Sequence, residues 1–505
     1  MQAAEDAPPE PIAAFLGTPA THAVVDIGSN TVRLVLYGGS PRAPMVLLNE
    51  KVTARLGREL GETGRLADEA VDLAMRGLRR FALLIDAHGV EDVQTVATAA
   101  VRDAENGPQF LAQVREIGLS PRLLTGVEEA LTGAEGIIGA FPGACGIVAD
   151  LGGGSLELAR VAKGVAQEAV SFPLGTLRLP EYRGETDKAT RKALMKAIEG
   201  APAMPKRGCL YLVGGTLRAL ATFEIGETDY PVTDPHGFSL SAKDALAIAE
   251  GVAAMTPEDL QARPRVSGSR ASTLPDAAIL LSALIRKLEP ERIVFSSWGI
   301  REGLLQSALT QDLRAQDPLL AGIEAFGATR GCSPELARRI NAWSRPALKA
   351  TSDADKRTRL AATILSLASM QIEPNLRVAI ATGWALEKRW IGLSAKDRAK
   401  IATAIMANGN KDYAGGRWAT MLDTEELEEA AVWGLLVRLA RRLGGRTSAV
   451  FDSSRLRIAD GKLILEIESE HAAIFGIPSE KDMALLGEKL ALEPEVRTLD
   501  ALPSD

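Results

Sequence analysis

Short apolar runs alternate with longer amphipathic segments over residues 20–315. Runs such as HAVVD and VRLVLY have the length and β-branched content of strands, whereas ADEAVDLAMRGLRRFALLIDAHG repeats its apolar positions with the period of a helix. The alternation then starts again and ends in PDAAILLSALIRKLEPERIVFSSWGIREGLLQSAL, which reads as helix, strand, glycine turn and helix. This pattern predicts two α/β sheet domains, over residues 20–140 and 141–315.

The pattern changes after residue 316. Segments such as PELARRINAWSRPAL carry long helical periodicity with few β-branched runs, which predicts a helical domain over 316–446. Two strand-like runs, RLRIA and KLILEIES, then precede a helical segment and predict a small α+β domain over 447–505. Residues 1–19 are acidic and rich in Pro and Ala, without the basic and apolar regions of a signal peptide, and predict a disordered lead-in.

Composition limits the classes of partner. The chain has 505 residues, and its net charge of 58 − 65 = −7 gives no general case for binding nucleic acid or a membrane surface. Its three cysteines are widely spaced and lack metal-site spacing, which suits a reducing compartment. Because no apolar run reaches the length of a membrane span, we expect a cytoplasmic protein with no membrane and no nucleic-acid partner.

Charge is distributed unevenly along the chain. Residues 321–446 contain 20 Lys and Arg against 13 Asp and Glu, a balance of +7. This excess predicts a basic surface for a polyanion, and an ordinary solvated helical surface is the alternative. The candidate contributors are Arg338, Arg339, Arg357, Arg359, Lys388, Arg389, Lys396, Arg398 and Lys400.

Two octets match position by position: DIGSNTVR at 26–33 and DLGGGSLE at 150–157. Each reads as strand, glycine-rich turn and strand, hence a hairpin. Glycines let backbone N–H groups approach an anion, and the hydroxyl of Ser or Thr adds a donor. An Asp entering the turn can hold Mg²⁺ or its waters. Because Arg33 of the first copy matches Glu157 of the second, the pair predicts a phosphate-plus-metal site, with two plain hairpins as the alternative.

A third glycine turn lies at 212–216, between a strand-like run and a helical one. Gly215 and Thr216 would place backbone N–H groups at a helix N-terminus, which suits an anion. Alone this turn is a weak signal, about as well explained as a simple strand-to-helix connection, and it fits neither a P-loop nor a dinucleotide-binding fingerprint.

These motifs, taken together, resemble the exopolyphosphatase and guanosine pentaphosphate phosphohydrolase family, within the superfamily of acetate kinase, sugar kinases, Hsp70 and actin. The resemblance covers about residues 20–310 and implies a duplicated ribonuclease-H-like, actin-like fold. The segments that carry it, in the family's order, are VDIGSNTVRL (25–34), TAAVRDAEN (98–106), LLTGVEEA (123–130), VADLGGGSLEL (148–158), FPLGTLRL (172–179), LVGGTLRALA (212–221), DPHGFSL (234–240), SRASTLPDAA (269–278) and SSWGIREGLL (296–305).

The resemblance also implies roles for individual residues. Glu129 is the expected catalytic base that activates water, although the adjacent Glu128 leaves the register open. Asp150 and Glu157, with Asp26, are the expected ligands of Mg²⁺, and Mn²⁺ is the alternative metal. The expected phosphate-binding residues are Ser29, Asn30, Thr31, Arg33, Arg102, Gly153, Gly154, Ser155, Gly215, Thr216 and Arg270.

Long members of the family carry a domain that resembles HD phosphohydrolases, which bind metal through His and Asp. This chain has four histidines, His22, His88, His236 and His471, and none of them lies in 316–446. A His-based metal site there is excluded, so we expect a degenerate HD-like domain that binds or scaffolds. His236 is expected to be structural or to contact substrate. The resemblance further implies a homodimer.

The leading functional hypothesis is an exopolyphosphatase, which removes the terminal orthophosphate from inorganic polyphosphate with Mg²⁺. Within the family the alternative is release of the 5′ γ-phosphate from guanosine pentaphosphate. The alternative of a different class is a non-hydrolytic alarmone or phosphate-binding protein, or a kinase-like phosphate acceptor. A sugar kinase is disfavoured, because a pair of glutamates stands where water activation is expected.

Overall fold

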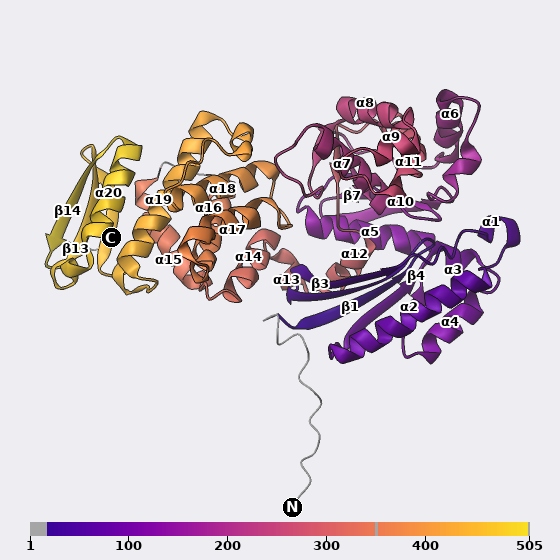
Figure 1. Ribbon diagram of the computed structural model, residues 1–505, viewed down its shortest axis with the longest axis horizontal. Helices are drawn as coiled ribbons and strands as arrows, with labels where there is room; N and C mark the ends of the chain where they lie inside the picture. Colours follow the sequence, from indigo (N-terminus) through magenta and orange to yellow (C-terminus); the bar gives the residue numbers. More distant parts are fainter. Residues whose placement is uncertain (1–17, 349–351, 503–505) are drawn as a thin grey trace, which may run out of the picture. The chain divides into compact units, whose positions relative to one another are not determined.

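The computed structural model describes residues 18–348 and 352–502, so nearly all of the predicted lead-in lies outside the described residues. The described chain forms two compact units (Figure 1). Unit 1 contains residues up to 230 and 234–318, and unit 2 contains 231–233 and the residues from 319 onward.

Unit 1 is built on two mixed sheets whose strands follow the same order. The first sheet has the order β3-β2-β1-β4-β5, and the second contains β8-β7-β6-β9-β11 with β10 added at its edge. In each, three antiparallel strands are followed by parallel ones. The strands are β1 (Ala20–Ile27), β2 (Val32–Ser40), β3 (Ala43–Val52), β4 (Asp92–Ala97), β5 (Pro121–Leu123), β6 (Gly146–Leu151), β7 (Leu156–Ala162), β8 (Val165–Phe172), β9 (Cys209–Val213), β10 (Ser239–Ser241) and β11 (Arg292–Phe295).

Helices cover both faces of each sheet. The outer helices α2 and α4 lie on the first sheet, whereas α7, α8 and α11 lie on the second; α5 and α12 lie between the sheets (Figure 1). The helices of unit 1 are α1 (Leu60–Thr63), α2 (Asp68–Ala87), α3 (Ala99–Asp103), α4 (Gly107–Glu116), α5 (Gly126–Ala140), α6 (Asp187–Ala197), α7 (Gly215–Glu227), α8 (Ala242–Ala253), α9 (Pro257–Gln261), α10 (Gly268–Ala271), α11 (Leu274–Leu288), α12 (Ile300–Ala308) and α13 (Gln311–Ala315).

Helices α5 and α12 form a middle layer between the two sheets. The alternation of side chains along each strand decides which of them face this middle layer. In β1, Val25 and Ile27 pack in the core beneath α2, while Val24 packs against α12. In β6, Ile147 and Ala149 pack toward the outer helices and Val148 packs against α5. Because successive side chains of a strand point to opposite faces, the acids that end β1 and β6 both point toward the middle layer.

Helices α5 and α12 cross at backbone contact. A Cβ on Gly136 would lie 2.3 Å from the carbonyl oxygen of Gly299, and one on Gly303 would lie 1.8 Å from the carbonyl oxygen of Thr132. Only glycine permits such an approach at these positions. The crossing therefore places the third turn of α5, around Gly136, against the start of α12, and both helices contribute side chains to the site described below.

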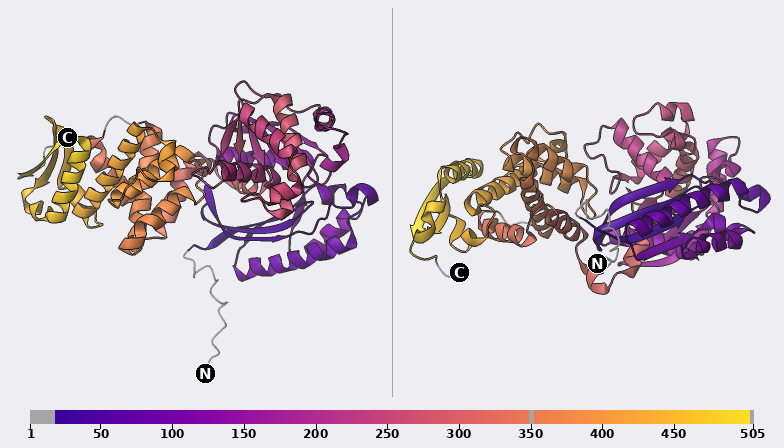
Figure 2. Two further views of the ribbon diagram at one scale, coloured as in Figure 1. Left: turned by 45° about the horizontal axis from the view of Figure 1, so that its top comes forward. Right: turned by 60° about the horizontal axis from the view of Figure 1, so that its bottom comes forward.

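Unit 2 is mainly helical, as expected, and ends in a three-stranded sheet of order β12-β13-β14. Buried residues of this sheet, such as Leu456 and Leu465, belong to the same hydrophobic core as Trp433 and Leu439 of α19. Figure 2 shows the sheet and α20 side by side at the C-terminal end of the unit. The elements are α14 (Pro318–Ala328), α15 (Pro334–Ser344), α16 (Asp353–Ala368), α17 (Pro374–Leu386), α18 (Ala395–Asn408), α19 (Thr424–Gly444), β12 (Ser454–Ala459), β13 (Lys462–Glu468), α20 (Ile477–Leu490) and β14 (Glu493–Leu499).

Part of the basic excess of 321–446 lies in the interior of unit 2 and not on its surface. Arg359, Arg398 and Lys400 are buried, at 6%, 1% and 7% exposure, so they are wrong as contributors to such a surface. Arg359 donates to Ser344 Oγ, and Arg398 donates to two carbonyl oxygens near the end of α17. These guanidinium groups form hydrogen bonds within the interior of unit 2.

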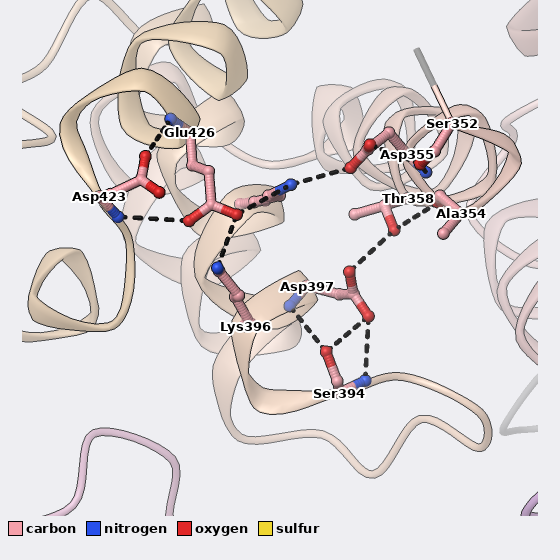
Figure 3. A network of polar contacts seen from close by, with 10 residues as sticks. Ser352, Ala354, Asp355, Thr358, Ser394, Lys396, Asp397, Asp423 and Glu426 are labelled. Carbon is pink, nitrogen blue, oxygen red and sulfur yellow. Dashed lines mark hydrogen bonds and ion pairs between the residues drawn. The ribbon is translucent and has the colours of Figure 1, made fainter.

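Other basic side chains of this set are held by carboxylates. Lys396 pairs with Glu426 at 2.7 Å, and Lys400 pairs with Asp355 at 2.8 Å, where the capped starts of α16, α18 and α19 meet (Figure 3). Arg338 and Arg339 pair with Glu324 and Asp452, respectively.

Among the described residues, no helix is both long enough and apolar enough to cross a bilayer.

Candidate active site

The two matching octets form hairpins with the same register. In the first, Asp26 pairs across the strands with Arg33, and in the second Asp150 pairs with Glu157. Paired residues of two neighbouring strands point to the same face. All four side chains therefore face the middle layer, where α5 and α12 lie.

The tips of the two hairpins touch. A Cβ on Gly154 would lie 2.6 Å from Ser29 Oγ, and a Cβ on Gly153 would lie 3.1 Å from the backbone nitrogen of Asn30. The glycines of the second loop thus leave room for the first loop and for the cavity beside it. The cavity holds about 170 Å³. The expected site residues that line it are Asp26, Ser29, Asn30, Thr31, Arg33, Glu129, Asp150, Gly153, Gly154, Ser155, Glu157, Gly215, Thr216 and Arg270.

The two adjacent glutamates of α5 lie in different surroundings. Glu128 is exposed and completes a capping box: its carboxylate accepts from the backbone N–H and the hydroxyl of Thr125, both at 2.8 Å. These hydrogen bonds lower the pKa of Glu128. Glu129 instead lines the cavity, with a side chain 14% exposed. The geometry therefore brings Glu129, and not Glu128, to the site.

Burial shifts the acids of the cavity toward their protonated forms. It raises the pKa of Glu129 to about 7, with Arg102 opposing the shift and Asp150 adding to it. Burial likewise raises the pKa of Asp150 to about 6, against the nearby charge of Arg218. For Glu157, burial and then the neighbouring Glu129 raise the pKa well above its usual range. A nearby cation stabilises the ionised form of such buried carboxylates and lowers their pKa values.

These acids fit a divalent metal held partly by water. Asp26, Asp150 and Glu157 line one cavity, but within residues 18–348 and 352–502 their ligand atoms do not all lie within 4.8 Å of one another. A complete protein cage is therefore not formed. Mg²⁺ is commonly bound by one or two carboxylates together with waters and substrate phosphates, and the donor set here suits that mode.

Arginines also line the cavity. Arg33 and Arg270 have lowered pKa values, first because of burial and, for Arg33, next because of the charge of Arg301. Arg270 Nη1 donates to Thr216 Oγ1 at 2.9 Å, and a Cβ on Gly215 would lie 2.4 Å from the guanidinium. The third glycine turn thus supports an arginine beside the helix start. Guanidinium groups that repel one another in a cavity suit a polyanion.

Arg102 lies behind the cavity rather than on its wall. It does not line the cavity of the two hairpins, but its Nη1 donates to Glu129 Oε2 at 3.2 Å and to the carbonyl oxygen of Leu124 at 3.0 Å. Its position is that of a group that orients Glu129. Arg102 is thus an expected phosphate-binding residue that does not line this cavity, and its contact with phosphate stays a prediction.

Arg301 is the main residue that the sequence reasoning missed. It lines the cavity from the start of α12, and its Nη1 donates to Asp26 Oδ2 at 3.2 Å. Its pKa is raised, because the lowering effect of burial is outweighed by Glu302 and Asp26. Glu302 is held in turn by the hydroxyl of Tyr37 and the backbone of Gly299. Thr98, Thr176, Arg218 and Ser297 also line the cavity without having been assigned a role.

His236 is buried and has a structural position. Its Nδ1 accepts from the backbone N–H of Ser297 at 3.2 Å, and its ring stacks on Phe141 with 4.9 Å between centroids. It does not line the cavity itself, but it supports Ser297, which does.

The two sheets of unit 1, with their matching strand orders and matching hairpins, are consistent with the class of proteins built from duplicated actin-like domains. The chain belongs to the Ppx/GppA phosphatase family, whose profile matches residues 37–312. It is 27% identical to Exopolyphosphatase 2 of Mycobacterium tuberculosis, over 56% of this chain and 97% of that protein. It is 28% identical to Exopolyphosphatase 1 of Mycobacterium leprae, over 57% of this chain and 89% of that protein.

A solved structure gives the same result for the fold. The crystal structure of the Ppx/GppA family member of Aquifex aeolicus superposes with a TM-score of 0.51 at 27% identity, and covers 57% of this chain and 97% of that one. Each of these likenesses covers little more than half of the chain.

Proposed function

We propose that this protein is an exopolyphosphatase that hydrolyses the terminal phosphoanhydride bond of inorganic polyphosphate and releases orthophosphate. The observation that carries the proposal is the position of Glu129, with its pKa of about 7, in a cavity that also holds Arg33, Arg270 and Arg301. A base with a pKa near neutrality and a set of cations for a polyanion are what hydrolysis of a phosphate chain requires.

The residues divide the chemistry between them. Backbone N–H groups and hydroxyls of the two hairpin loops hold the terminal phosphate, and the arginines neutralise its charge. Glu129 takes a proton from the attacking water; because Oε2 accepts from Arg102, we assign this proton to Oε1. The water oxygen bonds to phosphorus as the bond to the bridging oxygen breaks, and the shortened chain carries the released charge.

Asp150, Glu157 and Asp26 would hold Mg²⁺, or Mn²⁺ in its place, through carboxylate oxygens and waters. When bound, the metal neutralises charge on the phosphate oxygens and lowers the repulsion between the acids. The raised pKa values of Asp150 and Glu157 support this assignment, since both acids resist ionising without a cation.

One experiment distinguishes the proposed exopolyphosphatase from two alternative functions. A guanosine pentaphosphate 5′-phosphohydrolase would use the same cavity, and a non-hydrolytic alarmone or phosphate-binding protein would use the loops without turnover. The test is orthophosphate release by the full chain with Mg²⁺ from long polyphosphate, tripolyphosphate and guanosine pentaphosphate, with Glu129→Gln as control. Release from guanosine pentaphosphate alone supports the first alternative, and binding without release supports the second.

We also propose, from the family resemblance, that the helical region is a degenerate HD-like domain; the absence of histidine from 316–446 supports only its degeneracy, since no His-based metal site can form there. A homodimer is proposed from the family resemblance; a monomer mass in light scattering at micromolar concentration would contradict it.

We further propose that long polyphosphate also binds outside the cavity, through exposed basic residues of 321–446 such as Arg338, Arg389 and Lys396. Charge reversal at Arg389 should weaken the salt dependence of the KM for long chains, but not for tripolyphosphate.

A further inference from the structure

A second cavity opens directly behind Glu129. It holds about 280 Å³ and shares Gly154 and Ser155 with the cavity of the two hairpins. Arg102, which contacts Glu129, lies on its wall, and Arg178 lies on the same wall. The two cavities therefore adjoin at the second hairpin loop, and Arg102 of the second cavity contacts Glu129 of the first.

The wall of this second cavity carries two arginines that share one carboxylate. Asp103 bridges the two arginines, with its Oδ1 3.4 Å from Arg102 Nε and its Oδ2 3.1 Å from Arg178 Nη2. Their side chains are about one quarter exposed, at 24% and 25%. Ser171, whose hydroxyl donates to Glu157 at 2.8 Å, adds a polar group at the side nearest the acids.

The direction of the reaction decides what enters this cavity. In an in-line displacement, the attacking water and the leaving group lie on opposite sides of phosphorus. Glu129 marks the side of the water, so the chain that leaves lies on the side of phosphorus away from Glu129. The second cavity lies on the water's side, where the incoming oxygen and the newly formed orthophosphate are found after the bond has broken.

We infer that the cavity lined by Arg102 and Arg178 is a binding site for product orthophosphate, through which it leaves while the shortened chain stays in the hairpin cavity. The inference rests on the proposed function, because it uses Glu129 as the group that marks the attacking side. Arginine suits orthophosphate, since its N–H groups form paired hydrogen bonds with phosphate oxygens.

Proton transfer favours the movement of product toward this site. Before the reaction, Arg102 is shared by the carboxylates of Glu129 and Asp103. Once Glu129 Oε1 holds the proton of the water, its charge is neutralised and Arg102 has one carboxylate partner fewer. The second cavity therefore becomes more positive at the moment when orthophosphate appears.

The test compares two variants of the full-length protein, which should change inhibition by added orthophosphate in opposite directions. Arg178→Gln removes a cation and should weaken inhibition by added orthophosphate on the order of tenfold, the loss of one charge-assisted contact. Asp103→Asn removes the competing carboxylate and should strengthen that inhibition. The KM for long polyphosphate should stay within about twofold in both, and Arg178→Lys should restore part of the inhibition.

Three outcomes overturn the inference. If Arg178→Gln raises the KM for polyphosphate and leaves phosphate inhibition unchanged, the cavity binds the incoming chain. If neither quantity moves in either variant, the cavity binds neither. If both variants shift inhibition in the same direction, distortion of the loop explains the effect.

Calorimetric titration of the wild type and Arg178→Gln with inorganic phosphate separates this inference from the proposed function. A wild type that releases no orthophosphate from any phosphate substrate refutes the proposed function. Phosphate affinity that does not depend on Arg178 refutes the site even if hydrolysis is observed.

Discussion

Glu128 and Glu129 are neighbours on the first turn of α5, yet the carboxylate of Glu128 caps its own helix and that of Glu129 lies in the cavity beside Arg102. Glu129→Gln should therefore lower kcat by about 10²–10⁴-fold, the usual contribution of a general base. Substrate affinity should be largely kept, because the phosphate-holding groups remain. Steady-state rates of orthophosphate release measure both quantities.

Glu128→Gln is the matched control for this change. It alters the same side chain type one residue away and should leave kcat within a few-fold, with a small loss of stability from the weakened cap. An enzyme that keeps its rate in Glu129→Gln and loses it in Glu128→Gln would reverse the assignment.

The pH profile should report the charge state of Glu129. The base acts as a carboxylate, so kcat/KM is retained above its pKa and falls as the pH drops below about 7. Arg102 lowers this pKa, so Arg102→Gln should move the acidic limb to higher pH. Profiles at saturating Mg²⁺ measure the shift, with Arg115→Gln, on the last turn of α4, as control. A limb that stays in place or moves to lower pH in Arg102→Gln would contradict the prediction.

Removal of the acids paired across the second hairpin should change the metal requirement. Asp150→Asn and Glu157→Gln should each raise the Mg²⁺ concentration for half-maximal activity, on the order of 10–100-fold. The KM for polyphosphate at saturating Mg²⁺ should change less. Glu168→Gln, at an exposed acid of β8, is the control. An unchanged Mg²⁺ curve in both variants would reduce these acids to ordinary hairpin residues.

Glu157 should also make the metal-free protein less stable at higher pH. Its pKa is raised in the folded state, so the folded protein binds more protons than the unfolded chain above the usual Glu pKa, and stability falls as the pH rises. In EDTA, the unfolding temperature should fall between pH 5 and 8 and fall less in Glu157→Gln. Calorimetry gives the comparison, with about 2–4 °C expected for each 1 kcal/mol in a domain of 150–250 residues. Equal slopes in the two proteins would refute it.

The glycine crossing of α5 and α12 gives a prediction about stability and activity together. Gly136→Ala places a Cβ 2.3 Å from the backbone of Gly299, so we expect about 1–3 kcal/mol or more of destabilisation and a lower kcat. Gly251→Ala on α8 is the control, since its Cβ would contact nothing within 4 Å and should stabilise by up to about 1 kcal/mol. Denaturant unfolding measures both, and equal effects would contradict the crossing.

Much of this site could be predicted because its backbone motifs are local. The two octets each fold into a hairpin with their own turn residues, so their repetition was readable along the chain. The choice between Glu128 and Glu129 was also readable in principle: Thr125 followed three residues later by Glu128 is a capping-box pattern. That signal would have placed Glu128 at the helix start and left Glu129 for the cavity.

Other features depend on contacts that no local pattern contains. Arg301 reaches Asp26 across 275 positions of sequence, and the packing of α12 against β1 brings them together. The basic excess of 321–446 did not predict which basic residues are exposed. A charge count treats every Lys and Arg as solvated, whereas Arg398 and Lys400 are buried among hydrogen-bond partners of their own unit.

The matched register of the two hairpins has a consequence for the polarity of cleavage. A linear phosphate polymer has two identical ends and carries no direction of its own, so the protein has to impose one. Arg33 and Glu157 occupy equivalent places in the two halves and bear opposite charges. A perfectly symmetric pair of loops would make the two directions along the cavity equivalent. The opposite charges of Arg33 and Glu157 are among the differences that break this pseudosymmetry, so, under the proposed function, the two directions differ for a bound phosphate chain.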